Sequence, residues 1–298
     1  MKNTIDKQFV IPLAPSIRQR NEMFDSLFYD VKTLTDEEKY QLSSLTDREG
    51  SILVVFPQKK KKGIVHSPDA STFLQSEVFK TIQIIVVAGV GSSALGTAAL
   101  ARNVANVYDI PVAGIVSGYG ASDLITEAMG GWFFYGATDA IRHSIRETVN
   151  SWNNALTFFK TEKKADEAGL SKEMKQSELE DINALEEILN ASPPKLRLLV
   201  GHSKGSLMLD YALENFANKH DNHVYFDQLK IVTFSAVTDI SPQFKNVQQF
   251  IGEYDGFGKI NSRIHIPRTP VPHASHHLNS TLPFYLDIED VLRQHVTL

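Results

Sequence analysis

The sequence predicts an α/β fold in which helices flank a mostly parallel central sheet. Three observations predict it. The β-branched segment Thr81–Ala88 runs directly into a glycine-rich turn and then a helical stretch, Thr97–Tyr108. A second strand, Pro111–Val116, follows and completes a β-α-β unit, whose strands must be parallel. Further along, the apolar run Leu198–Val200 ends in the pattern Gly-x-Ser-x-Gly, and a helix-compatible segment follows at once.

Residues 1–50 are polar and mixed, and we expect them to form an N-terminal extension that packs on the main domain, residues 51–298. Helices are expected at Ser16–Lys32 and Thr35–Leu45. The second begins with a threonine followed by three acidic residues, which is typical of a helix N-terminus. A first buried strand is predicted at Ser51–Pro57, where five apolar residues follow one another.

The rest of the chain continues the alternation of strands and helices. Residues 121–170 are expected to form a helical insertion before the strand that carries the serine, and a charged helix is expected at Ser171–Leu189. Two more strands are predicted at Ile231–Phe234 and Val247–Gly252. A closing helix at Leu286–Val296 ends the chain. In such a sheet, ligands bind beyond the carboxyl ends of the strands.

Composition excludes several classes of protein. A chain of 298 residues, 42% of them hydrophobic, can bury the core of one large α/β domain. A formal net charge of −5 gives no basic surface for nucleic acid, and the lack of cysteine excludes disulfides and thiol nucleophiles. No signal peptide is visible, and no apolar run approaches the roughly 18 residues of a membrane span. We therefore expect a cytoplasmic protein of open oligomeric state, without a transmembrane segment.

The segment Gly201-His202-Ser203-Lys204-Gly205 predicts a nucleophile elbow. In this turn a buried strand stops, the backbone turns sharply, and a serine hydroxyl is held exposed at the top of the sheet. Glycines two residues on either side of Ser203 fit this interpretation, because strand and helix pass too close there for side chains. The other interpretation is a small residue in a tight turn, without catalysis.

A serine hydroxyl becomes a good nucleophile when an imidazole takes its proton and a carboxylate orients that imidazole. The chain supplies both groups after the serine. Asp255 comes directly after the predicted strand Val247–Gly252. Three histidines, His273, His276 and His277, lie on a loop of small residues before the last helix. These histidines have no nearby acid ligand, so a metal site is the weaker interpretation, and no cofactor is expected.

From about residue 50 to residue 298, the chain resembles the α/β-hydrolase superfamily, particularly its lipase and esterase branches. In that family a turn of the form Gly-small-Gly-His precedes the last helix, and Pro272-His273-Ala274-Ser275-His276 is similar. The resemblance therefore favours His276 as the catalytic histidine, with His277 as the close competitor and His273 third. Asp255 is the favoured acid, and Asp239 is the alternative because some lipases take their acid from the preceding strand.

An acyl-transfer enzyme also needs hydrogen-bond donors for the developing oxyanion. The backbone N–H of Lys204, the residue after the nucleophile, is one candidate. In the family, the second donor comes from the loop after an earlier strand, which here is Ala88-Gly89-Val90-Gly91-Ser92-Ser93. The resemblance makes the Val90 N–H the first candidate for this donor and the Gly91 N–H the next.

The insertion contains Gly130-Gly131-Trp132-Phe133-Phe134-Tyr135-Gly136, which could form a hydrophobic wall or lid. Trp132 and Phe133 would then contact the acyl group, with the paired glycines acting as hinges. Ordinary helix core is the alternative interpretation.

These patterns together favour a serine hydrolase that cleaves a carboxylic ester, with a small-molecule or lipid ester as substrate. One alternative is a catalytically silent hydrolase-fold protein that binds a partner. Another is a nucleotide- or sugar-phosphate-binding enzyme that uses the loop Gly89–Gly96, which approximates a dinucleotide fingerprint. That fingerprint expects an acid about 20 residues on, and the segment Val116–Gly120 contains none.

Overall fold

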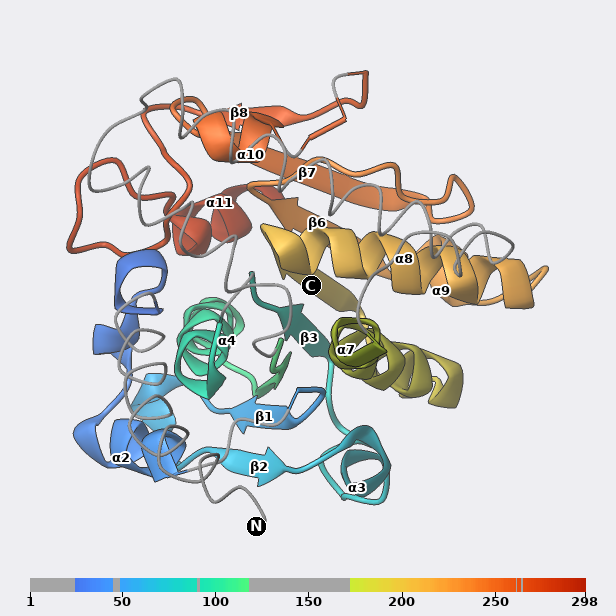
Figure 1. The fold of residues 1–298 in the computed structure, drawn as a ribbon, viewed down its shortest axis with the longest axis horizontal. Helices are drawn as coiled ribbons and strands as arrows, with labels where there is room; N and C mark the ends of the chain where they lie inside the picture. The colour runs from blue at the N-terminus through green and yellow to red at the C-terminus, as the bar shows by residue number, and fades with distance from the viewer. Residues whose placement is uncertain (1–24, 45–48, 90–91, 118–171, 261, 264) are drawn as a thin grey trace, which may run out of the picture.

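The computed structural model describes residues 25–44, 49–89, 92–117, 172–260, 262–263 and 265–298. In this part of the chain, eight strands form one sheet in the order β2-β1-β4-β3-β5-β6-β7-β8 (Figure 1). The strands are β1 (Ile52–Val55), β2 (Val65–Ser67), β3 (Ile84–Val87), β4 (Val112–Ile115), β5 (Leu198–His202), β6 (Lys230–Phe234), β7 (Asn246–Gly252) and β8 (Thr269–Val271).

The sheet is mostly parallel. From β4 to β8 every neighbouring pair of strands is parallel, whereas β1 runs antiparallel to both β2 and β4. This arrangement confirms the predicted α/β class. It also places the carboxyl ends of β3, β5, β6, β7 and β8 at one edge, where ligands bind in sheets of this kind.

Helices cover both faces of the sheet. The described helical segments are η1 (Val31–Thr33), α2 (Asp36–Ser44), η2 (Gln58–Lys60), α3 (Ala70–Leu74), α4 (Ala94–Tyr108), α7 (Lys172–Ala191), α8 (Lys204–Lys219), α9 (Tyr225–Gln228), α10 (Gly256–Ile260) and α11 (Ile288–His295). Figure 1 shows α4 and α11 on one side of β3 and α7 and α8 on the other. None of the helices in the described ranges is long and apolar enough to cross a membrane.

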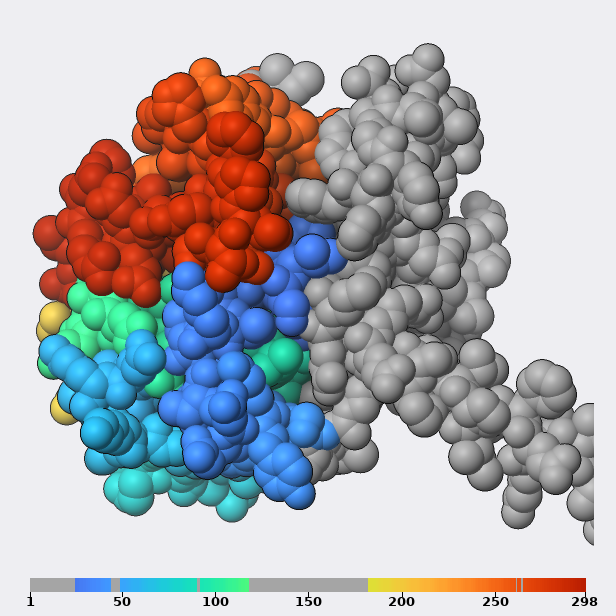
Figure 2. Space-filling model, turned by 90° about the vertical axis from the view of Figure 1, so that its left-hand side faces the viewer, coloured from blue at the N-terminus to red at the C-terminus, as the bar shows by residue number. Residues whose placement is uncertain are grey.

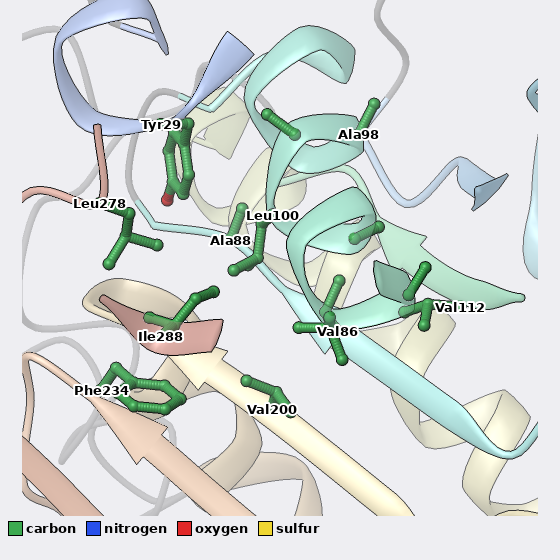
Figure 3. Packing of buried hydrophobic residues seen from close by; sticks show 14 of the residues in the cluster. Tyr29, Val86, Ala88, Ala98, Leu100, Val112, Val200, Phe234, Leu278 and Ile288 are labelled. Carbon is green, nitrogen blue, oxygen red and sulfur yellow. The ribbon is translucent and has the colours of Figure 1, made fainter. Parts of the chain in front are cut away.

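Each central strand contributes to two hydrophobic cores, because successive side chains point to opposite faces. In β3, Ile84 and Val86 pack in the core under α4 and α11, whereas Ile85 and Val87 pack in the core under α7 and α8. Figure 3 shows part of the first core, where Val86 lies beneath α4. All four side chains are fully buried. Burial on both faces explains why these strands appear in the sequence as continuous apolar runs rather than alternating ones.

The longer predicted elements are confirmed, with ends shifted by a few residues. The two helices expected in the first 50 residues differ: α2 is confirmed, whereas the helix expected at Ser16–Lys32 is confirmed in its described part only for residues 25–28. Residues 25–28 are helical, the chain then bends, and η1 follows. The bend exposes backbone groups that pair with other segments, including the Phe28 carbonyl, which accepts from Leu278 N–H.

Several short elements of the described chain are not predicted from the sequence, among them β2, α3 and β8. None of these three has a run of apolar residues long enough to define a strand or helix. β8 contains Pro270 at its centre and lies at the sheet edge, where a missing N–H costs no ladder bond on the open side. The insertion at 121–170, with Trp132 and Phe133, lies outside the described residues.

The N-terminal residues pack on the sheet through α2 and the segment before it. Thr35 and Glu38 form a capping box: Glu38 N–H donates to Thr35 Oγ1 at 3.2 Å, and Thr35 N–H donates to Glu38 Oε2 at 2.9 Å. Glu38 also pairs with Arg102 of α4, and both side chains are buried. In Figure 2 this part of the chain (blue) lies directly against the C-terminal part (red).

Candidate active site

Ser203 occupies the turn between β5 and α8. Its backbone has φ 54° and ψ −122°, a conformation that non-glycine residues rarely adopt. Holding a residue there costs about 1–3 kcal/mol, and the surrounding structure must impose it. Two backbone hydrogen bonds do so: Ser203 N–H donates to Phe234 O at 2.8 Å, and Ser206 N–H donates to Ser203 O at 3.0 Å.

The flanking glycines are required by close packing. A Cβ on Gly205 would overlap the carbonyl oxygen of Val87 and lie 2.6 Å from that of Ala88. A Cβ on Gly201 would lie 2.7 Å from Ser206 Cα. Backbone atoms cannot move aside as a side chain can, so α8 reaches β3 and β5 only because both positions lack a side chain.

Three side chains from separate loops meet at the carboxyl edge of the sheet. His276 Nε2 lies 3.0 Å from Ser203 Oγ. On the other side of the ring, His276 Nδ1 lies 2.9 Å from Asp255 Oδ1 and 3.0 Å from Oδ2. All three residues are buried. Because an ionised carboxylate only accepts, His276 Nδ1–H donates to Asp255, which leaves Nε2 to accept from the Ser203 hydroxyl.

Asp255 is fixed between β7 and α10. Gly258 N–H donates to Asp255 Oδ1 at 2.5 Å, and a Cβ on Gly258 would lie 2.6 Å from Ser235 O. Burial by itself would raise the pKa of the Asp255 carboxyl, but the charge of His276 and the hydrogen bonds from His276 and Gly258 outweigh it and lower the pKa. The carboxylate therefore stays ionised beside the imidazole.

Aromatic rings enclose His276. The rings of Phe257 and Phe28 meet it edge to face, at centroid distances of 4.9 and 6.0 Å. His202 lies beside it at 5.3 Å, and His202 Nε2–H donates to the backbone oxygen of His276 at 3.0 Å. These contacts restrict rotation of the imidazole and exclude water from its faces.

The alternative residues lie elsewhere. His277 Nε2 donates to Pro283 O at 3.1 Å, so its ring turns away from Ser203. Burial is the main cause of a lowered pKa for this histidine. His273 is exposed and contacts Tyr254 Oη at 2.9 Å, and Asp239 is also exposed. Within the described residues, no cluster of histidine and acidic side chains is arranged to hold a metal ion.

The oxyanion donors are described only in part. Lys204 is the first residue of α8 and directly follows Ser203. Val90 and Gly91 lie outside the described residues. The N–H of the preceding Gly89 donates to Tyr29 Oη at 2.6 Å, so it does not point to substrate.

Two residues of this site escaped the sequence analysis. Tyr29, in the N-terminal segment, contacts Gly89 and also His202 Nδ1, the latter at 3.0 Å. Neither contact leaves a local pattern, because 60 and 173 residues separate the partners. His202 carries a weak signal, since it stands next to Ser203 in the elbow and points away from solvent at the end of a buried strand.

The serine, the acid and the histidine follow β5, β7 and β8 in turn. A serine on a strained strand–helix turn, followed by the acid and then the histidine, is the chain order of the α/β-hydrolase fold. The protein has an α/β-hydrolase-type fold. No family model matches the sequence, and no curated protein matches it.

Among solved structures, the chain is similar to one titled a dienelactone hydrolase-like promiscuous phosphotriesterase, P91, from metagenomic libraries. The identity is 10% and the TM-score 0.31, over 72% of this chain and 82% of that one. A similarity this low has no bearing on activity, so the function rests on the arrangement of side chains in this protein.

Proposed function

We propose that the protein is a serine hydrolase that cleaves a carboxylic ester through an acyl-enzyme. The observation that carries the proposal is His276, which contacts the Ser203 hydroxyl with one ring nitrogen and the Asp255 carboxylate with the other. A non-catalytic serine in a tight turn, with a histidine nearby by chance, would require neither a strained backbone at the serine nor a carboxylate that orients the histidine. This chain maintains both.

In the first half-reaction, Ser203 Oγ attacks the ester carbonyl carbon while His276 Nε2 accepts the hydroxyl proton. The charge that develops on the carbonyl oxygen is stabilised by the backbone N–H of Lys204 and by the loop that contains Val90 and Gly91. The C–O bond to the alcohol then breaks. The alcohol leaves with the proton from His276, and the acyl group remains on Ser203.

In the second half-reaction, water attacks the acyl carbon and gives one proton to His276. Collapse of the intermediate breaks the bond to Ser203 Oγ, which recovers its proton, and the carboxylic acid leaves. Asp255 does not take the proton; it stabilises the imidazolium that forms in each half. This chemistry suits a small-molecule or lipid ester, and the resemblance to lipases and esterases supports that class.

A fluorophosphonate probe and a p-nitrophenyl ester series test the proposal. Wild-type protein should be labelled covalently and should hydrolyse the esters. Ser203→Ala should lose labelling and about 10⁶-fold in kcat, and Asp255→Asn about 10⁴-fold, as in other serine hydrolases with such triads. Ser71→Ala, at an exposed position of α3, is the matched control and should behave as wild type.

The same experiment separates the other candidate functions. Folded wild-type protein that is neither labelled nor active would contradict the proposal and favour a silent hydrolase-fold binding protein. A nucleotide-dependent rise in Tm, together with no labelling, would favour use of the loop Gly89–Gly96 for a phosphate ligand.

A further inference from the structure

The hydroxyl of Tyr29 lies between two parts of the candidate site. Its oxygen is 2.6 Å from the backbone nitrogen of Gly89, in the loop after β3, and 3.0 Å from His202 Nδ1, at the end of β5. Tyr29 and His202 are both almost completely buried. Figure 3 shows Tyr29 entering from the N-terminal segment, with its ring near Ala88 and Leu278.

Only one assignment of donors and acceptors is consistent for the hydrogen bonds that join Gly89, Tyr29, His202 and His276. The His276 backbone oxygen can only accept, so His202 must carry its proton on Nε2. His202 Nδ1 is then an acceptor, and the Tyr29 hydroxyl donates to it. The Tyr29 oxygen in turn accepts from Gly89 N–H. The resulting relay runs from Gly89 through Tyr29 and His202 to the backbone of His276.

The relay joins the two halves of the reaction centre. At one end, Gly89 begins the loop from which an oxyanion donor is expected. At the other end, His276 is the group that contacts Ser203 Oγ. A Cβ on Gly89 would lie 3.1 Å from Ser203 Cβ and 3.1 Å from Tyr29 Oη, so Gly89 packs closely against both the serine and the tyrosine.

Further contacts fasten the segment that carries Tyr29 to the histidine loop. We call residues 25–30 the N-terminal strap. Leu278 N–H donates to Phe28 O at 2.7 Å, and Asn279 Nδ2 donates to Ser26 O at 2.5 Å. At its other end, Ser93 N–H donates to Asp25 Oδ2 at 3.2 Å, just before α4. The strap therefore contacts the loop after β3 and the loop after β8 together.

We propose that Tyr29 and His202 are positioning residues, which set the distance between Gly89, at the end of β3, and the His276–Ser203 pair through this relay. The inference rests on the proposed ester hydrolysis. Tyr29 acts through the backbone of Gly89, whereas His202 acts on the backbone of His276 and also lies beside its ring.

Ordinary packing does not require these two side chains. A phenylalanine and a leucine would fill similar volumes, but they would leave the Gly89 N–H and the His276 carbonyl without these partners, and a buried unpaired polar group costs about 1–3 kcal/mol. Burial, followed by the nearby His276, lowers the pKa of His202 to about 3. Its ring therefore stays neutral, and the direction of the relay holds throughout the pH range in which the enzyme would work.

The first test is Tyr29→Phe, which keeps the ring and removes both hydrogen bonds of the hydroxyl. We expect kcat for p-nitrophenyl esters to fall about 10- to 100-fold, as small misplacements of reacting groups do, with KM changed less than 3-fold. The rate of fluorophosphonate labelling should fall in parallel. Tyr40→Phe is the matched control, since Tyr40 lies on α2 with 78% of its surface exposed.

The second test distinguishes positioning from packing. Gln at position 202 can still donate to the His276 carbonyl, whereas Leu cannot, so His202→Gln should keep at least about 5-fold more kcat than His202→Leu. If the relay is one unit, Tyr29→Phe combined with His202→Leu should lose little beyond His202→Leu alone. A structural role predicts neither the rescue nor the lack of additivity.

The outcomes are distinguishable. If wild-type protein is neither labelled nor active, both the proposed function and this inference are contradicted. Active wild-type protein with unchanged kcat in Tyr29→Phe would overturn the inference alone. If Tyr29→Phe shows the wild-type kcat at temperatures well below its own Tm, the inference is overturned. Equal losses of kcat in His202→Gln and His202→Leu would overturn it too, and either result would leave the two residues with a packing role only.

Discussion

Two buried polar clusters join the N-terminal segment to the rest of the molecule, and they differ in the groups that they contact there. The first is the ion pair of Glu38 in α2 with Arg102 in α4. The second is the relay from Tyr29 to Gly89 and His202. Tyr29 packs in the core on the face of the sheet that α4 and α11 cover, and Glu38 and Arg102 join α2 to α4.

The first cluster ends in a helix. Arg102 lies midway along α4, and its partner Glu38 also completes the capping box of α2, so this pair serves to attach one helix to another. The second cluster ends at backbone atoms of the reaction centre. Burial and pairing alone therefore do not mark a functional residue, whereas the group at the far end of the hydrogen bonds does.

The largest effect is expected from Glu38→Ala. It leaves the Arg102 guanidinium buried without its partner and removes half of the capping box, which should lower the free energy of unfolding by about 3–5 kcal/mol. kcat per folded molecule should stay at the wild-type value, because the pair does not contact the site. Urea unfolding, and kcat normalised to the fraction labelled by fluorophosphonate, measure the two quantities.

The control for this prediction removes both charges. Glu38→Gln with Arg102→Met keeps the volume and the capping side chain, so at least half of the lost stability should return. A fall in kcat per labelled molecule in either variant would contradict the comparison, since the first cluster would then also reach the site.

The sequence could predict the fold and the meeting of the three catalytic candidates for one physical reason. Parallel strands end at the same edge of a sheet, so Ser203 and Asp255, which follow apolar strands, must lie near one another. The choice of histidine could not be made from the residues alone. It depends on the turn at His273, whose φ is 55°, and on the short strand β8, which is defined only by its pairing with β7.

The N-terminal strap could not be predicted at all. Its contacts depend on the bend after residue 28, where the sequence predicts a continuing helix. Tyr29 meets His202 across 173 residues, and a single tyrosine in a polar segment has no periodic pattern to mark it. Such contacts follow from the tertiary packing of the whole chain and not from local preference.

An intermediate effect is expected in the pH dependence of stability of His202→Gln. The pKa of His202 is about 3 in the folded protein and near 6.5 in the unfolded chain, so between these values only the unfolded chain binds the proton. Stability of wild type therefore falls as pH falls through this window, by up to about 1.4 kcal/mol per unit. His202→Gln lacks this dependence.

Urea unfolding at pH 6.5 and pH 5.0 measures the difference. Wild type should lose about 1.6 kcal/mol more than His202→Gln over this interval. Asp255 does not confuse the result: its pKa is lowered, so the stability it contributes is lost only as pH falls below the unfolded value near 3.9. His265→Gln, at an exposed histidine, should keep the wild-type slope. Equal slopes in wild type and His202→Gln would show that His202 titrates normally and is not held by the relay.

The smallest effect comes from a matched pair of helix caps, one beside each cluster. Thr35 caps α2, where Glu38 N–H donates to its hydroxyl, and Ser93 caps α4, where Leu95 N–H donates to its hydroxyl at 3.0 Å. Thr35→Ala and Ser93→Ala should each cost about 1–2 kcal/mol of stability. Only Ser93→Ala should also lower kcat, by several-fold, because Ser93 holds Asp25 of the strap.

Equal stability losses with unequal rates would mean that the N-cap residue of α4, Ser93, influences the reaction through the strap, whereas Arg102 in the middle of the same helix does not. If both variants kept wild-type kcat, the influence of the strap on the reaction would be confined to Tyr29, and Asp25 would serve only to fasten the segment to α4. Steady-state rates on a p-nitrophenyl ester, with the labelled fraction as the count of folded enzyme, decide between these cases.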